Sequence, residues 1–211
     1  MRDMPFFTTR LGVSSLTLSQ IPYTKQAYIR IQDSREPEAF LQECLGFCKA
    51  LGAEKVYATG HAVCEKYPEY ATLLSMQADK SVIGETDASV FPVTEDTLKK
   101  WVEIYNSKIL KIPGGAWMCK QMADQMLYDG DGYFVHRNGE LLGIGKVCGK
   151  EIAWVASIVS GAGADVVRAL CHAISDDTVC LEVAVQNQKA VNLYNRLGFL
   201  PTGIVSVWYA L

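Results

Sequence analysis

Apolar side chains along this chain recur with two different spacings. In some stretches they occupy every second position, which is typical of strands that bury one face. In others they occupy every third or fourth position, which is typical of helices. Strands and a helix follow one another in the first part of the chain, so we expect a small α/β unit there. Its expected elements are strands over 11–19, 25–33, 55–59 and 70–77 and a helix over 34–51 that ends at Gly52.

A second and longer unit is expected after the polar stretch 80–89, which is the candidate boundary. The chain is therefore expected to divide into a small α/β domain of unknown role over 1–85 and a second domain over 86–211. Within the second domain, Asn138-Gly139 between two apolar runs predicts a β-hairpin, because both residues tolerate positive φ. The expected elements are helices from Thr94 to 109 and over 116–128, 164–174 and 187–197, and strands over 133–136, 141–148, 151–159, 179–185 and from 199 onward.

The strand–helix–strand step from 151 to 185 implies two parallel strands joined by a right-handed crossover. The rest of the sheet is expected to be mixed, so the fold class is α/β with a mixed sheet. A weaker version of the same step occurs over 27–59. Two interpretations of it stay open, a half-repeat of the second domain or an unrelated αβ unit.

Composition restricts the function further. The chain has 211 residues, of which 49% are hydrophobic and 20% charged, as in globular proteins. A net charge of −3 and the lack of a Lys/Arg-rich run give no electrostatic support for a nucleic-acid partner. No apolar run reaches the roughly 18 residues of a membrane span, so no membrane partner is expected. Seven cysteines without a Cys-x-x-Cys pair indicate free thiols in a cytoplasmic protein with no metal site.

A small-residue loop between an expected strand and an expected helix is the first candidate binding site. It contains Gly161, Ala162, Gly163 and Ala164. Glycines let a ligand approach the backbone closely, and the start of a helix offers unpaired N–H groups that suit a pyrophosphate. The same pattern also occurs in tight turns that bind nothing, and that interpretation stays open.

The segment from Asn187 to Phe199 carries a more specific pattern, a capped amphipathic helix that is closed by a glycine. It resembles the C-terminal signature of the GNAT (GCN5-related N-acetyltransferase) family, Asn-x-x-Ala-x-x-Leu-Tyr-x-x-Leu-Gly-Phe. The resemblance covers residues 89–211 and implies a GNAT-type fold there, with acetyl-CoA as the cosubstrate. The fixed positions are met by Asn187, Ala190, Leu193, Tyr194, Leu197, Gly198 and Phe199.

The resemblance also implies roles for single residues. Tyr194 matches the tyrosine that serves the leaving sulfur, as general acid. Glu151 is the candidate base at the start of a strand, although the interpretation favoured by the residue type alone is a solvent-exposed glutamate after a turn. At the first position of the family's loop, where Arg or Gln is usual, this chain has Ile158. The expected cofactor-binding residues are Val155, Ala156 and Ser157 for the carbonyl and pantetheine, Gly161, Ala162, Gly163 and Ala164 for the pyrophosphate, and Asn187 for the pantetheine arm or the helix start.

Together these features predict an N-acetyltransferase that transfers the acetyl group to a primary amine by direct attack in a ternary complex. The acceptor is a small-molecule or protein amine that the sequence does not identify. Trp117 and Tyr128 lie in the segment that resembles the acceptor-lining helix, where they could contact the acceptor or pack in the core. The alternative is a catalytically inactive GNAT-fold module that binds acyl-CoA or a protein. A homodimer is left open.

Overall fold

The computed structural model describes residues 6–110, 112 and 115–211. Its residues fall into two compact units, which we call unit 1 and unit 2. Unit 1 comprises the described residues up to Leu73 together with Ile204–Leu211, and unit 2 comprises Leu74–Gly203. These bounds differ from a division at residue 85, because strands β5 (Glu69–Asp79) and β11 (Leu200–Ala210) each contribute residues to both units.

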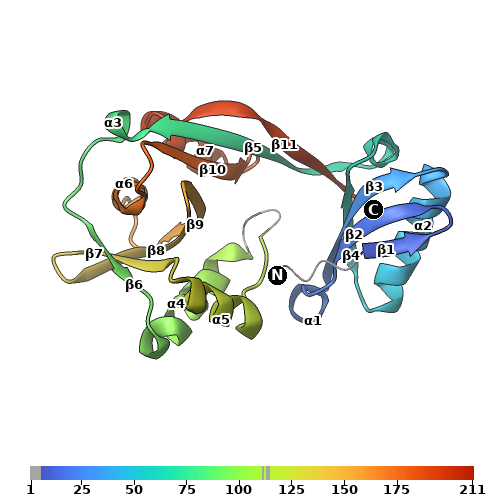
Figure 1. Ribbon diagram of the computed structural model, residues 1–211, viewed down its shortest axis with the longest axis horizontal. Helices are drawn as coiled ribbons and strands as arrows, with labels where there is room; N and C mark the ends of the chain where they lie inside the picture. The colour runs from blue at the N-terminus through green and yellow to red at the C-terminus, as the bar shows by residue number, and fades with distance from the viewer. Residues whose placement is uncertain (1–5, 111, 113–114) are drawn as a thin grey trace. The chain divides into compact units, whose positions relative to one another are not determined.

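Unit 1 is a sheet with one long helix. Its strands follow the order β1-β2-β3-β4-β11, and among the described residues of this unit β3 and β4 are the parallel neighbours. Helix α2 packs against this sheet (Figure 1), and its buried Phe40 and Leu41 belong to the same hydrophobic core as Ile29 of β3. The elements are β1 (Phe6–Thr9), β2 (Gly12–Thr17), α1 (Ile21–Thr24), β3 (Gln26–Ser34), α2 (Pro37–Ala50), β4 (Lys55–Thr59) and a 3-10 turn, η1 (Ala62–Lys66).

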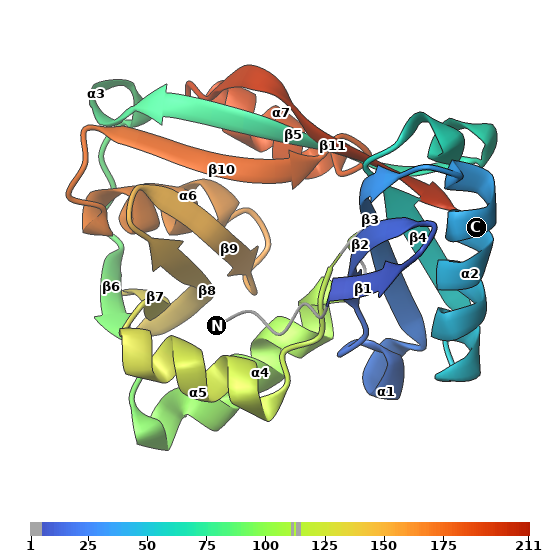
Figure 2. The same cartoon turned by 45° about the vertical axis from the view of Figure 1, so that its right-hand side comes forward.

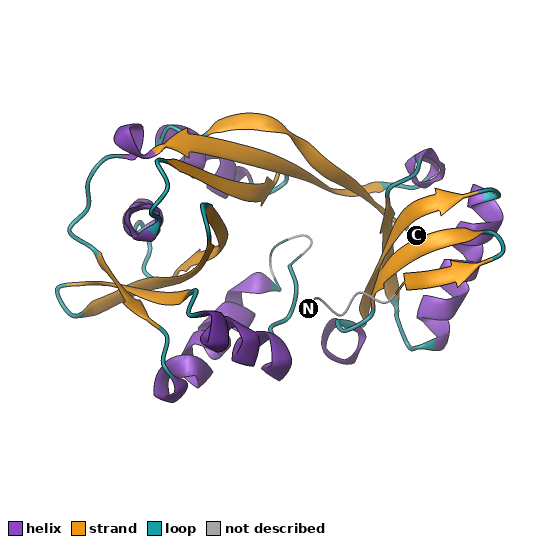
Figure 3. Cartoon of the chain, viewed as in Figure 1, coloured by secondary structure: helices purple, strands orange, loops and turns teal. Residues whose placement is uncertain are grey.

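Unit 2 contains a larger mixed sheet with helices packed against it (Figure 3). Its strands follow the order β11-β5-β10-β9-β8-β7-β6. All pairs from β6 to β9 are antiparallel, and β9 and β10 are parallel. The elements are α3 (Lys80–Ile83), β6 (Ser89–Pro92), α4 (Glu95–Ile109), α5 (Lys120–Asp129), β7 (Gly132–Arg137), β8 (Glu140–Cys148), β9 (Glu151–Ser157), α6 (Gly163–Ala173), β10 (Thr178–Ala184) and α7 (Gln188–Arg196).

The expected mixed α/β architecture is confirmed, and so are the expected helix cap at Thr94 and the hairpin turn at Asn138-Gly139. Thr94 caps α4 and forms a capping box with Thr97. Asn138 and Gly139 both have positive φ, 51° and 83°, which is the geometry of the tight hairpin turn between β7 and β8. Four short strands and α-helices, β1, α1, β6 and α3, were not expected. Each has only four residues, too few to show a period in the sequence.

The two units share one order of elements. In unit 1 two antiparallel pairs, β1-β2 and β2-β3, lead into a parallel pair, β3-β4, across helix α2. In unit 2 the pairs β7-β8 and β8-β9 lead in the same way into β9-β10 across helix α6. The weaker strand–helix–strand step over 27–59 therefore belongs to a repeat of the topology of unit 2.

Helix α6 lies very close to strand β8 because two glycines of that strand face it. A β-carbon at Gly143 would come within 2.8 Å of Val166, and one at Gly145 would overlap the side chain of Leu170. Val166 and Leu170 are fully buried residues of α6. The glycines therefore set the height of α6 above the sheet, and with it the position of the helix start.

We predict that Gly145→Ala lowers the free energy of unfolding by about 1–3 kcal/mol, because Leu170 must leave its packed position. Gly46→Ala is the matched control. Gly46 lies inside α2, and a β-carbon there would touch nothing, so the substitution should stabilise the protein by roughly 0.5–1 kcal/mol. Urea unfolding of both variants checks this. Equal stability of Gly145→Ala and the wild type would contradict the close packing.

A second prediction concerns Asn187, the cap of α7, whose side chain accepts a hydrogen bond from the N–H of Ala190 at 3.4 Å. Asn187→Ala should lower the free energy of unfolding by about 1 kcal/mol, because one N–H at the helix start loses its acceptor. Asn187→Asp keeps an acceptor there and should retain most of the stability. If the two variants unfold at the same urea concentration, the cap does not stabilise α7.

Candidate functional site

Strands β9 and β10 separate soon after they meet. Their register contains two pairs, Cys180↔Glu151 and Leu181↔Ile152, although β9 continues to Ser157 and β10 to Ala184. Figure 2 shows β9 turning away from β10. The corresponding strands of unit 1, β3 and β4, stay in register over five pairs. Unit 2 therefore exposes a strand edge that unit 1 keeps closed.

A β-bulge lies where the strands separate. On the other edge of β9, Val147 pairs with Ile152 and Lys146 with Trp154, so Ala153 has no partner residue on β8. In a regular strand Ile152 and Trp154, two residues apart, would lie on the same face, but the bulge directs them to opposite faces of the sheet. Ile152 joins the core beneath α6, whereas Trp154 packs against Tyr105 of α4, with ring centroids 4.9 Å apart. Bulges of this kind are common beside functional sites because they redirect side chains and end strand pairing.

The open edge of β9 carries backbone groups of the expected cofactor-binding strand. Consecutive residues of an antiparallel strand direct their N–H and C=O groups to opposite edges. The N–H of Ile158 donates to Leu142 of β8 at 2.8 Å, so Ile158 and Ala156 face β8. Val155 and Ser157 therefore direct their N–H and C=O groups toward the edge from which β10 has departed.

The loop that follows β9 leads directly into α6. Gly161 has a φ of +85°, a conformation that favours glycine, and a β-carbon there would meet nothing within 4 Å. The N–H of Ala162 donates to Val159 within the turn at 3.3 Å. Among the described residues, no acceptor is placed for the N–H groups of Gly163, Ala164 and the following Asp165, and no side chain caps the helix. The helix start thus presents free donors and the positive end of its dipole.

Two arginines balance the negative charge of Asp165 in the first turn of α6. The guanidinium of Arg137 at the end of β7 donates to Asp165 at 2.8 Å, and that of Arg168 lies 3.6 Å away. Ile158, where the family's loop usually has a basic or amide side chain, is about one-third exposed. Sequence reasoning missed Arg137, because it lies 28 residues from Asp165 and no local pattern links the two.

Tyr194 lies on the inner face of α7, next to the core. Its side chain packs against Phe199, with ring centroids 5.8 Å apart, and the residue is only 6% exposed. Burial, with a smaller contribution from nearby Cys171, raises the pKa of Tyr194 to about 12. The hydroxyl therefore keeps its proton at neutral pH and can donate it but cannot act as a base.

Glu151 lies at the other end of β9 from the glycine loop. It begins the strand and is partly exposed, and it pairs with Cys148 on β8 and Cys180 on β10. A strand rises about 3.3 Å per residue, so Glu151 lies about 20 Å along the strand from Ser157. The glutamate is thus beside the point where the strands separate, and the loop is at the far end of the open edge.

Aromatic side chains line the α4 side of the sheet near the bulge. Trp101, Tyr105 and Trp154 contact one another, and the ammonium of Lys146 lies 5.1 Å from the centre of the Trp154 ring. Lys146 also pairs with Asp131 at 3.0 Å. Tyr128 of α5 is 88% exposed, so it is not a core residue.

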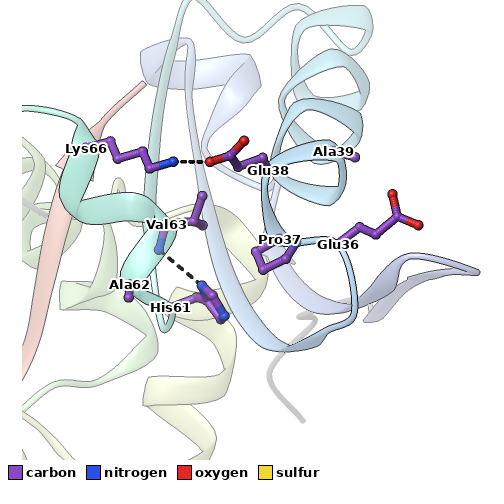
Figure 4. A pocket seen from close by; sticks show the side chains of 8 residues that line it. All are labelled: Glu36, Pro37, Glu38, Ala39, His61, Ala62, Val63 and Lys66. Atoms are coloured by element: carbon purple, nitrogen blue, oxygen red, sulfur yellow. Dashed lines mark hydrogen bonds and ion pairs between the residues drawn. The ribbon is translucent and has the colours of Figure 1, made fainter.

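Unit 1 has a cavity of about 630 Å³ at the start of its own crossover helix, α2 (Figure 4). Its chemistry differs from that of the loop in unit 2. Pro37 provides no N–H donor, and the carboxylates of Glu36 and Glu38 lie at the helix start. Lys66 pairs with Glu38, and His61 accepts a hydrogen bond from the N–H of Val63 at 3.1 Å. Two carboxylates at this position disfavour a phosphate, so the candidate site for an anionic cofactor is in unit 2.

The described residues contain no cluster of three or more His, Cys, Asp or Glu side chains that could hold a metal ion. No helix within the described ranges is both long and apolar enough to cross a lipid bilayer.

Comparisons with known proteins agree with this geometry. No protein-family model matches the chain, and no curated protein matches its sequence. Solved structures do match. A functionally unknown conserved protein from Staphylococcus epidermidis has a TM-score of 0.64 and 11% identity, over 100% of this chain and 94% of that one. A GCN5-related N-acetyltransferase from Sphaerobacter thermophilus has a TM-score of 0.62 and 11% identity, over 94% of this chain and 76% of that one.

A third solved structure bears on the repeated topology. It is a tandem GNAT protein from the clavulanic acid biosynthesis pathway, with a TM-score of 0.58 and 11% identity over 95% of this chain and 78% of that one. Identities this low carry information about the fold alone. They confirm the expected architecture: this chain has the fold of the GNAT acetyltransferases.

Proposed function

We propose that this protein is an N-acetyltransferase of the GNAT family that transfers the acetyl group of acetyl-CoA to a primary amine. The observation that carries the proposal is the separation of β9 from β10 after Ile152, directly before a loop whose helix start has free N–H donors. An extended ligand with an anionic end fits such an arrangement, because a strand edge can pair with its amides and the helix start can bind its phosphates.

The open edge of β9 suits the pantetheine arm of the cofactor. Val155 and Ser157 direct N–H and C=O groups to this edge, where they can hydrogen-bond the amides of the arm. The donors at Gly163 and Ala164 suit the pyrophosphate, and Gly161 leaves space above the loop. When bound, acetyl-CoA supplies a thioester whose carbonyl carbon the amine attacks.

Two protons must move during the transfer. The incoming amine has to lose one, and the departing sulfur has to gain one or accept a hydrogen bond. Tyr194 is the proposed donor to sulfur, because its hydroxyl stays protonated and the chain matches the family's tyrosine position there. Glu151 is the proposed acceptor of the amine proton, since its strand position is at the start of the open edge. Asn187 holds the start of α7, which carries Tyr194.

A non-catalytic acyl-CoA-binding protein is the second candidate function. The observation that favours it is Ile158, which removes a polar side chain from the loop. Such a protein would bind acetyl-CoA and release no CoA in the presence of any amine. Binding and turnover therefore have to be measured separately.

Acetyl-CoA and free CoA should both bind the wild-type protein in isothermal titration. Gly161→Val should weaken binding about tenfold or more, because it places a branched side chain where the phosphates have to approach the backbone. Gly163 is unsuitable for this test, because a β-carbon there would lie 3.1 Å from Leu193 of α7 and would disturb packing as well. Gly130→Val is the matched control. Like Gly161 it has positive φ and open space around it, but it ends α5. A folded wild-type protein that binds neither ligand would rule out the acetyltransferase proposal.

Tyr194→Phe should lower kcat by a factor of about 10²–10⁴, the usual contribution of a general acid, while acetyl-CoA affinity changes little. The measurement is thiol release with a panel of primary amines, once an accepted amine has been found. Tyr23→Phe on α1 of unit 1, where the side chain is about half exposed, controls for the substitution itself. Unchanged kcat in Tyr194→Phe would show that this hydroxyl does not serve the leaving group.

A further inference from the structure

The guanidinium of Arg137 lies beside the first turn of α6. Its Nη1 donates to Asp165 Oδ2 at 2.8 Å and lies 3.8 Å from Asp87 Oδ1. Asp165 also holds Arg168, whose Nη1 is 3.6 Å from Oδ1 and whose Nε donates to the carbonyl of Ile83 at 3.1 Å. One carboxylate therefore fixes two guanidinium groups at the start of the helix.

Arg137 has donors to spare. Both of its contacts use Nη1, and within the described part of the chain no acceptor is placed for Nε or Nη2. A guanidinium carries five N–H donors in a planar fork, and the Nε–Nη2 edge matches two oxygens of a phosphate. The side chain is 34% exposed, so part of it is accessible to a ligand.

The position of Arg137 in the sheet indicates which part of an extended cofactor would lie next to it. Arg137 ends β7, which is separated from β9 by β8 in the sheet, whereas the proposed pantetheine site lies on the opposite edge of β9. The helix-start donors lie between these two places along the loop side of the sheet. A ligand with its thioester end on β9 and its pyrophosphate at α6 would thus present its far end to Arg137. In CoA, the remaining anionic group at that end is the 3′-phosphate of the ribose.

We propose that Arg137 binds the 3′-phosphate of CoA and supplies, from strand β7, the positive charge that Ile158 does not provide in the loop. This assignment rests on the proposed function. Asp165 is a positioning residue in it, because it orients the guanidinium without having to touch the ligand. Asp87 is the weaker and more exposed partner, so it is the group that the phosphate displaces.

The test compares CoA with dephospho-CoA, which lacks only the 3′-phosphate, by isothermal titration at a fixed salt concentration. The wild-type protein should bind CoA about tenfold or more tightly than dephospho-CoA, as expected for a charge-assisted phosphate contact. Arg137→Gln should lower the affinity for CoA to that for dephospho-CoA and leave the latter unchanged. Arg137→Lys should retain part of the preference, because it keeps the charge and loses the fork.

Arg196→Gln is the matched control. Arg196 is an exposed arginine in the last turn of α7, so its loss should change neither affinity. Equal affinity of the wild type for the two ligands would overturn the assignment while leaving the proposed function intact. So would an equal loss of both affinities in Arg137→Gln, since that would indicate displacement of α6. A folded wild-type protein that binds neither ligand would overturn the proposed function, and this assignment with it.

Discussion

The close contact between α6 and β8 is the constraint on which the candidate site depends. Two glycines on the strand let Val166 and Leu170 reach the sheet, and the ion pairs of Asp165 fix the first turn of the helix to the end of β7. The helix start, with its free N–H groups, is thereby held at the end of β9. Backbone donors that are already in place bind an anion more tightly, because the entropic cost of ordering them is not paid on binding. A rigidly placed helix start meets that condition.

The two units differ at the positions that make up the candidate site in unit 2. Both units have the same order of strands around a crossover helix, yet their parallel strands behave differently. In unit 1 the pair stays closed over five residues, and the helix begins with proline between two glutamates. In unit 2 the pair opens after two residues, and the helix begins after a glycine loop. The same topology thus carries a helix start that disfavours an anion in unit 1 and one that favours an anion in unit 2. A few residues at the strand end and the helix start make this difference.

Sequence reasoning succeeded where the structure is determined locally. The Asn187 cap, the Asn138-Gly139 turn and the glycine loop all follow from the conformational preferences of adjacent residues. It could not find the bulge at Ala153, because a bulge depends on the register between two strands. It also missed the pairing of Arg137 with Asp165, which depends on how a helix is placed over a sheet. The division of the chain was hard to see for the same reason, since residues 204–211 join residues distant in sequence.

The shared strands β5 and β11 make unit 1 discontinuous in sequence, with unit 2 between its two parts. Protein synthesis proceeds from the N-terminus, so every residue of unit 2 leaves the ribosome before the segment 204–211 that lies beside β4. The unit that begins first is therefore completed last. Until then the edge of β4 lacks the partner that β11 provides, and an unpaired edge is the kind of surface at which chains pair wrongly. Nascent chains would be most exposed to misassembly during that interval.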